Sequence, residues 1–143
     1  MNRDFLWAPW RMDYITNPNK GNNIFVEKAN SDNDRDNLVL YRGEKSFVLM
    51  NLYPYNNGHL MIAPYEVYND LSDLDSDTFL EITKLTQQSI IILKEKLNHQ
   101  GINFGLNMGE AAGAGIKDHL HFHIVPRWIG DSNFMPVVGQ TNV

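Results

Sequence analysis

The chain has 143 residues, a net charge of −5 and no cysteine. This length allows one domain with a single core, and the absence of cysteine excludes disulfides and thiolate chemistry. Proteins that hold DNA or RNA by its phosphates need many cationic contacts, and the sequence contains no Lys/Arg cluster. No apolar run approaches the roughly 20 residues of a membrane span, and the first residues lack the apolar core of a signal peptide. We therefore expect no nucleic-acid or membrane partner, and a cytoplasmic location.

The amino-terminal part of the chain divides into two stretches. Residues 1–20 are rich in aromatic side chains and contain two prolines, which predicts an arm packed against the body of the protein; the aromatic residues are Phe5, Trp7, Trp10 and Tyr14. Residues 21–143 are predicted to form the single domain. Its first stretch, residues 21–37, is rich in Asn and Asp and is predicted to be irregular, with a short apolar piece at 24–26.

Three strands are predicted next. Residues 38–41 form a short apolar run, and residues 46–51 and 59–64 flank a connection at 53–58 that consists of turn-forming residues. Two apolar runs joined by such a connection predict a β-hairpin. Asn51 then ends the first strand of the hairpin and His59 opens the second.

The stretch from residue 72 to residue 97 changes to a helical period. Apolar residues recur at steps of three and four, which is typical of an amphipathic helix; with one threonine, they are Phe79, Ile82, Thr86, Ile90, Leu93 and Leu97. Thr78 and Glu81 resemble a capping box, and Ser76 or Asp75 are equally suitable caps. We expect Gly101 to end this helix.

A strand at 102–108 and a glycine-rich segment at 107–116 follow the helix. Glycine lets the backbone approach a ligand closely and point N–H groups at it. Placed directly before a row of histidines, this segment would hold phosphate oxygens. The alternative is a flexible hairpin loop without a ligand.

Three of the five histidines, His119, His121 and His123, lie at alternate positions with apolar residues between them. This two-residue period is typical of a strand, which we expect to end at Pro126. The three imidazoles would then project from one face of the strand, while Leu120 and its apolar neighbours pack on the other. A helix with the same spacing would spread the rings around its axis.

Three aligned imidazoles suit two kinds of chemistry. A His-x-His pair with a third ligand can bind zinc. Alternatively, one neutral imidazole can attack phosphorus or carbon while its neighbours orient it and supply protons. The remaining possibility is a polar strand face with incidental histidines.

Several motifs together resemble the histidine triad (HIT) superfamily of nucleotide hydrolases and transferases. They are the triad at 119–125, the hairpin segment 51–60, and Asn107-x-Gly109 before the triad. The segments 6–15 and 125–134 resemble the branch that contains diadenosine tetraphosphate (Ap4A) phosphorylases. The resemblance covers essentially the whole chain, with its motifs in the expected order.

The resemblance implies an α+β, HIT-like fold, in which a long helix packs on an antiparallel sheet of about five strands, and a homodimer. Zinc-containing HIT proteins carry cysteines at the positions of Asn23 and Val26, and a histidine after the proline that matches Pro64, where this chain has residues 65–67. A structural zinc of that kind has too few ligands here. We therefore predict no metal and no cofactor.

The resemblance also implies substrate-binding residues. Asn51 would bond the ribose hydroxyls, since an amide both donates and accepts hydrogen bonds. Apolar side chains near it would enclose the base: Leu49, Met50 and Met61. Further contacts are expected from His59, Asn107 and the loop residues Gly113, Ala114, Gly115 and Ile116.

The implied reaction is a double displacement on an adenine nucleotide or dinucleoside polyphosphate. His121 would attack the α-phosphate and form a nucleotidyl-histidine, while His119 and His123 bond the non-bridging oxygens or assist the leaving group. Water as the second acceptor makes a hydrolase, and inorganic phosphate makes a phosphorylase. Three alternatives stay open: an adenosine phosphoramidase of the same superfamily, a nucleotide-binding sensor with little turnover, and a metal protein that uses the triad as ligands.

Overall fold

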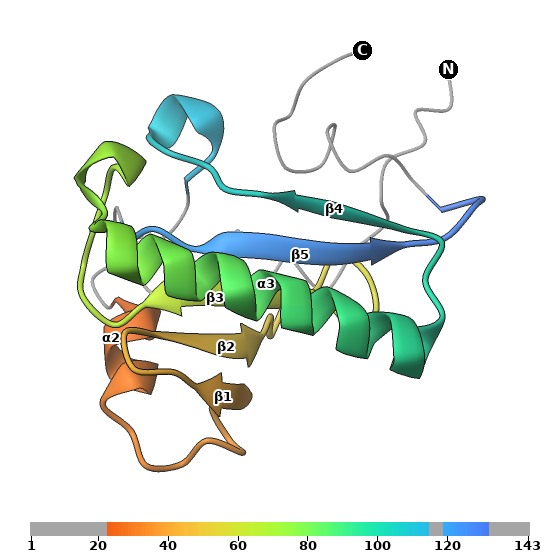
Figure 1. Cartoon of the computed structure of the whole chain (residues 1–143), viewed down its shortest axis with the longest axis horizontal. Coiled ribbons are helices and arrows are strands. Elements are labelled where there is room, and N and C mark those ends of the chain that lie inside the picture. The colour runs from red at the N-terminus through yellow and green to blue at the C-terminus, as the bar shows by residue number, and fades with distance from the viewer. Residues whose placement is uncertain (1–22, 115–118, 132–143) are drawn as a thin grey trace.

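Five antiparallel strands form one sheet in the part of the chain that the computed structural model describes, residues 23–114 and 119–131 (Figure 1). Their order is β1-β2-β3-β5-β4, and their bounds are Val39–Arg42 (β1), Ser46–Met50 (β2), Leu60–Pro64 (β3), Gly101–Gly105 (β4) and Phe122–Arg127 (β5). With one long helix on the sheet, this confirms the predicted α+β fold. None of the helices in these residues is long and apolar enough to cross a membrane. The predicted arm at 1–20 lies outside the described residues.

The predicted hairpin is formed by β2 and β3. They pair over their whole length, from Ser46 opposite Pro64 to Met50 opposite Leu60. The backbone N–H of Asn51 donates to the carbonyl of His59 at 3.1 Å and closes the ladder. The connection therefore leaves both of these residues at one end of the hairpin.

The long helix α3 spans Ser76–Leu97, and a 3-10 turn, η1, precedes it at Leu71–Asp73. Asp75 is the N-cap: its carboxylate accepts a hydrogen bond from the backbone N–H of Thr78 at 3.1 Å. The helix ends at Asn98 in the left-handed conformation (φ 48°), which asparagine tolerates better than most residues. The prediction that Gly101 supplies the stop was wrong, because this glycine already begins β4.

The irregular stretch predicted at 21–37 contains a short helix, α2, at Ile24–Ala29. It has six residues, of which only Phe25 is buried. Such a helix is too short to show a period in the sequence, and it depends on its caps. Its N-cap is Asn23, whose side-chain oxygen accepts from the backbone N–H groups of Phe25 and Val26.

The histidine strand is shifted from its predicted position. β5 begins at Phe122, so His119 and His121 precede it, and it continues through Pro126 to Arg127. A proline fits because pairing with β3 already ends at Ile124, so the missing N–H breaks no bond on that side. On the other side, the backbone N–H of Gln100 donates to the Arg127 carbonyl at 2.9 Å.

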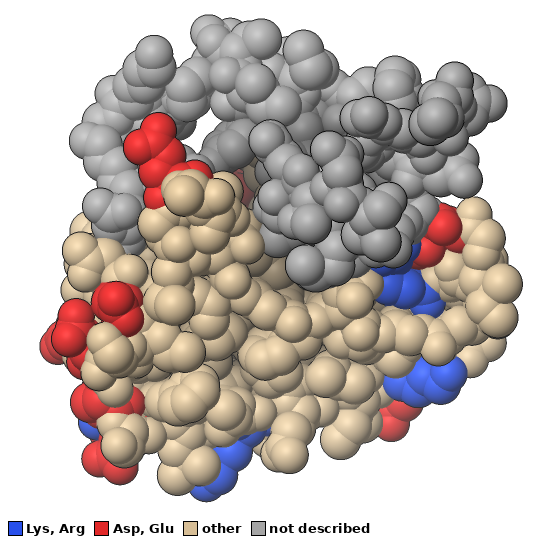
Figure 2. All heavy atoms as spheres, turned by 90° about the horizontal axis from the view of Figure 1, so that it is seen from above, with Lys and Arg blue, Asp and Glu red and all other residues tan. Residues whose placement is uncertain are grey.

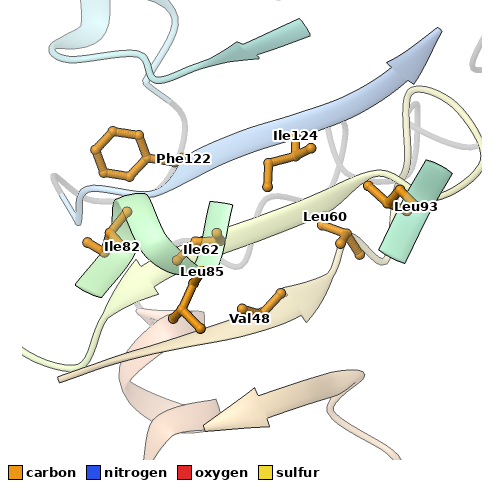
Figure 3. Close-up of a cluster of buried hydrophobic side chains, with 8 residues drawn as sticks. All are labelled: Val48, Leu60, Ile62, Ile82, Leu85, Leu93, Phe122 and Ile124. Atoms are coloured by element: carbon orange, nitrogen blue, oxygen red, sulfur yellow. The ribbon is translucent and has the colours of Figure 1, made fainter. Parts of the chain in front are cut away.

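The two faces of the sheet have different cores. On one face, residues of β2, β3 and β5 pack against α3 (Figure 3); the buried members of this cluster are Val48, Leu60, Ile62, Ile82, Leu85, Leu93, Phe122 and Ile124. On the other face, Phe25 of α2 packs on the sheet with Val39, Phe47, Leu49, Met61 and Ala63. The alternation in β5 sends Phe122 and Ile124 to the α3 face, and this leaves His123 on the α2 face.

Candidate active site

The three triad histidines lie together on the α2 face of the sheet. The ring of Phe25 is 5.1 Å from that of His119 and 4.7 Å from that of His121, measured between centroids. The rings of His121 and His123 meet edge to face at 4.8 Å. All three are at least nine-tenths buried. The structure therefore brings the triad together, as the alternation in the sequence predicts.

His121 presents an unprotonated nitrogen. Its Nδ1 lies 2.9 Å from the backbone carbonyl of His119, and a carbonyl only accepts, so Nδ1 carries the proton. Burial lowers the pKa of His121 to about 4, although the bond to the carbonyl acts in the opposite direction. The ring is therefore neutral at physiological pH, and Nε2 holds a lone pair. A neutral imidazole of this tautomer is what nucleophilic attack requires.

Both ring nitrogens of His119 are bonded to the protein. Nε2 donates to the carbonyl of Pro64 at 2.8 Å, and Nδ1 accepts from the side-chain amide of Asn23 at 2.9 Å. Burial lowers the pKa of this imidazole as well, against the effect of the Pro64 carbonyl. The arrangement differs from the expectation that His119 bonds phosphate oxygens, because it leaves neither nitrogen for a substrate. Its backbone carbonyl orients His121 instead.

His59 and His123 form a second chain of hydrogen bonds. The backbone N–H of Tyr55 donates to His59 Nδ1 at 3.1 Å, and His59 Nε2 lies 2.8 Å from His123 Nδ1. Since His59 accepts at Nδ1, its proton is on Nε2 and is donated to His123. The proton of His123 is then on Nε2. With 1% of its surface exposed, His59 lies behind His123 and orients it, where the sequence led us to expect a substrate contact.

The expected base and ribose contacts are only partly assembled. Leu49 and Met61 are paired across β2 and β3 and are buried on the α2 face of the sheet, where the histidines lie. Met50 follows Leu49 and therefore points to the α3 face, so the structure does not bring it together with the other two. The side-chain oxygen of Asn51 accepts from the backbone N–H of Tyr53 at 2.9 Å, so the expected ribose contact would have to use the amide nitrogen of Asn51.

The glycine-rich segment contains a 3-10 turn, η2, at Glu110–Ala112. Gly109 (φ 79°) and Gly113 (φ 89°) flank it in conformations that favour glycine. The N–H groups of Gly113 and Ala114 donate within the loop, to the carbonyls of Glu110 and Gly109. These two groups are therefore not directed at a phosphate, as the sequence led us to expect. The half-buried Asn107 precedes the loop, and Gly115, Ile116 and Lys117 lie outside the described residues.

A network after β5 anchors the loop that carries Asn51 and His59. The carboxylate of Asp131 accepts two hydrogen bonds from Arg127, at 2.6 and 2.7 Å, and one from the side chain of Asn56 at 3.0 Å. Asn56 also donates to the carbonyl of Pro126. Sequence reasoning used the segment around Asp131 only as a resemblance, and nothing in the local pattern indicated Asn56 as its partner.

Residues 32–128 match the family profile of the HIT domain. The chain belongs to the HIT family. An "AP-4-A phosphorylase" of Mycobacterium tuberculosis is 39% identical over an alignment of 147 positions. The alignment covers 96% of this chain and 75% of that protein. A bis(5'-adenosyl)-triphosphatase of Dictyostelium discoideum is 31% identical over 65% of this chain and 62% of its own length. The family assignment agrees with the resemblance seen in the sequence.

Solved structures of HIT proteins share the fold. A zinc-bound histidine triad family protein of Mycobacterium smegmatis has a TM-score of 0.62 at 28% identity, over 68% of this chain and 70% of that one. The diadenosine triphosphate hydrolase of Plasmodium falciparum, in complex with cyclomarin A, has a TM-score of 0.63 at 24% identity, over 72% and 69%. The second likeness concerns the fold alone.

A zinc ion does not fit the residues at the amino-terminal side of this HIT domain. The amide of Asn23 bonds His119 Nδ1, and Val26 supplies no ligand atom. Among residues 23–114 and 119–131, no group of three or more His, Cys, Asp and Glu side chains is placed to hold a metal ion. Asn23 was absent from the site predicted from the sequence. The available signal was its position, where the resemblance implies a cysteine in zinc-containing HIT proteins.

Proposed function

We propose that this HIT-family enzyme acts on the α-phosphate of adenine dinucleoside polyphosphates of the Ap4A type. The observation that carries the proposal is the hydrogen bond of His121. Its neutral imidazole donates its one N–H, on Nδ1, to the His119 carbonyl, with 2.9 Å between the nitrogen and the oxygen. The names of the mycobacterial and Dictyostelium relatives support the substrate class. On the face drawn in Figure 2, the basic side chains of the described residues lie apart from one another, which agrees with recognition by histidines and backbone groups.

The first step forms a covalent nucleotidyl-histidine. The lone pair of His121 Nε2 attacks the α-phosphorus of Ap4A, and the bond from that phosphorus to the bridging oxygen breaks. ATP leaves and AMP stays on the imidazole. His123, with its proton on Nε2, is the member of the triad suited to donate to a phosphoryl oxygen or to the leaving group. His119 fixes the position of His121 through its carbonyl.

The second step decides the name of the activity. If water attacks the intermediate, the products of Ap4A are ATP and AMP. If inorganic phosphate attacks, they are ATP and ADP, and the new terminal phosphate of ADP comes from the solution. The phosphorylase name of the 39% identical relative favours phosphorolysis.

Incubation of the purified protein with Ap4A and ³²P-labelled phosphate tests both steps. We expect ATP and labelled ADP, at a rate that rises with phosphate concentration. Unlabelled AMP at a rate independent of phosphate means hydrolysis. Faster cleavage of an adenosine phosphoramidate than of Ap4A assigns the protein to the phosphoramidases. Binding of AMP without turnover of any of these compounds contradicts the proposal and favours a sensor.

We also propose that the protein is a homodimer. β4 is an outer strand of the sheet, and its Phe104 is 45% exposed. Outer strands offer unpaired backbone groups and are commonly covered in proteins. A mass of two chains in light scattering is expected, and a mass of one chain at micromolar concentration contradicts it.

A further inference from the structure

The side chain of Asn23 joins the triad to helix α2. Its oxygen accepts from the backbone N–H groups of Phe25 at 3.0 Å and Val26 at 3.2 Å. Its nitrogen lies 2.9 Å from His119 Nδ1. Because two N–H donors hold the oxygen, the amide cannot turn over without losing both bonds. The group that faces His119 is therefore a donor, and it demands a lone pair on Nδ1.

This contact and the Pro64 carbonyl together fix the protonation state of His119. With Nδ1 accepting from Asn23, the proton is on Nε2, which donates a hydrogen bond to the Pro64 carbonyl at 2.8 Å. The imidazole is held on two opposite sides and is 2% exposed. The backbone carbonyl of His119 accepts a hydrogen bond from Nδ1 of His121. The orientation of His121 thus depends on a residue 96 positions before His119 in the chain.

Helix α2 gives Asn23 a second effect on the site. As N-cap, Asn23 starts the helix that carries Phe25, whose ring packs on both His119 and His121. The other end of α2 is held separately: the guanidinium of Arg42 donates to the carbonyls of Lys28 and Ala29, at 2.8 and 2.9 Å. The helix is therefore anchored at both ends, and only the Asn23 end touches a histidine of the triad.

We propose that Asn23 is a positioning residue, and that its amide does for His119 what a bound metal ion would do. At the position where the resemblance implies a cysteine ligand in zinc-containing HIT proteins, this chain has a donor that bonds the imidazole directly. A cation at Nδ1 would displace Asn23, and with it the cap of α2. The consequence for the reaction rests on the proposed function, whereas the consequence for the tautomer of His119 does not.

Substitution of Asn23 by Asp separates the two roles of the residue. An aspartate still caps α2, because both of its oxygens accept hydrogen bonds, but it cannot donate to His119. We expect the ring nitrogens of His119, observed by ¹⁵N NMR, to change from one protonated nitrogen to two near neutral pH. We expect kcat for Ap4A to fall about 10- to 100-fold, the range found for the outer hydrogen-bond partners of metal-ligating histidines, with KM changed less.

Arg42→Ala is the matched control. It releases the other end of α2 without touching a histidine, so the ¹⁵N shifts of His119 are expected to stay as in the wild type and kcat to change less than threefold. An equal loss of kcat in both variants would mean that only the anchoring of α2 matters, and it would overturn the proposal. Wild-type ¹⁵N shifts in Asn23→Asp would overturn it too.

Two further outcomes are separable. Asn23→Ser keeps a capping oxygen but is too short to reach His119, so it serves if Asn23→Asp does not fold. With no donor facing Nδ1, we expect this nitrogen of His119 to gain a proton at a higher pH than in the wild type, and an unchanged ¹⁵N titration contradicts the proposal. If the wild-type protein shows no turnover of Ap4A, the proposed function fails. The ¹⁵N shifts of His119 in the wild type and in Asn23→Asp still decide whether Asn23 keeps Nδ1 unprotonated.

Discussion

The two faces of the sheet are both buried, but they are stabilised in different ways. The α3 face is a hydrocarbon core, in which Phe122 and Ile124 pack against side chains such as Ile82. The α2 face buries four imidazoles among apolar residues. A hydrocarbon side chain needs only contact, whereas each ring nitrogen needs a partner of the right polarity. The first face therefore tolerates substitution of similar shape, and the second depends on individual hydrogen bonds.

The largest effect is expected at His121, on the α2 face. His121→Asn removes the proposed nucleophile but keeps a polar side chain, and kcat/KM for Ap4A should fall at least a thousandfold, which raises the activation free energy by about 4 kcal/mol. Mass spectrometry of the wild-type protein after rapid quenching should show one added AMP, absent from the variant. Turnover within tenfold of wild type would exclude His121 as the nucleophile.

On the α3 face, substitution of a buried side chain is expected to lower stability instead of activity. Ile82 is fully buried, so Ile82→Ala should lower the free energy of unfolding by about 2–5 kcal/mol. Because Ile82 does not touch the histidines, the kcat of the folded fraction should remain within about twofold. Urea titration measures the first quantity and an assay with Ap4A the second. A large loss of kcat in a fully folded sample would mean that the two faces are not independent.

The buried imidazole of His121 should also make the stability of the protein depend on pH. The pKa of His121 is about 4 in the folded protein and near its ordinary value of 6.5 when unfolded. The unfolded chain therefore binds this proton first, and the contribution of His121 to stability is complete above pH 6.5. It falls as the pH decreases towards 4, by about 3 kcal/mol in total from this group. Urea titrations of the wild type and His121→Asn between pH 7 and 4 measure it: equal slopes would contradict the low pKa.

A smaller effect is expected at His59, behind the triad. His59→Phe keeps the ring volume but leaves His123 Nδ1 and the Tyr55 N–H without this partner. An unsatisfied buried polar group costs about 1–3 kcal/mol, and His123 is free to change its tautomer. We expect a destabilisation of that size, measured by thermal unfolding, together with a lower kcat. If kcat is unchanged, His123 does not need its proton on Nε2.

Much of the architecture could be predicted from local patterns. The steps of three and four residues indicated α3, the run of turn formers indicated the β2–β3 hairpin, and the alternate histidines indicated a common face. These features depend on neighbours within one helix or strand. The errors fall where that is not so: α2 is too short to show a period, the end of α3 depends on Asn98 instead of Gly101, and Pro126 stays in β5 because the pairing with β3 has already ended.

The sequence alone indicated that three imidazoles share one face, and it singled them out as the candidates for the chemistry. Only the tertiary structure decided what each imidazole does, because the partner of a buried nitrogen comes from a distant part of the chain. His119 receives its partners from Asn23 and Pro64, 96 and 55 positions away, and His123 receives its partner from His59, 64 positions away. Those partners place the protons, and the placement of the protons distinguishes His121, the proposed nucleophile, from the residues that hold it.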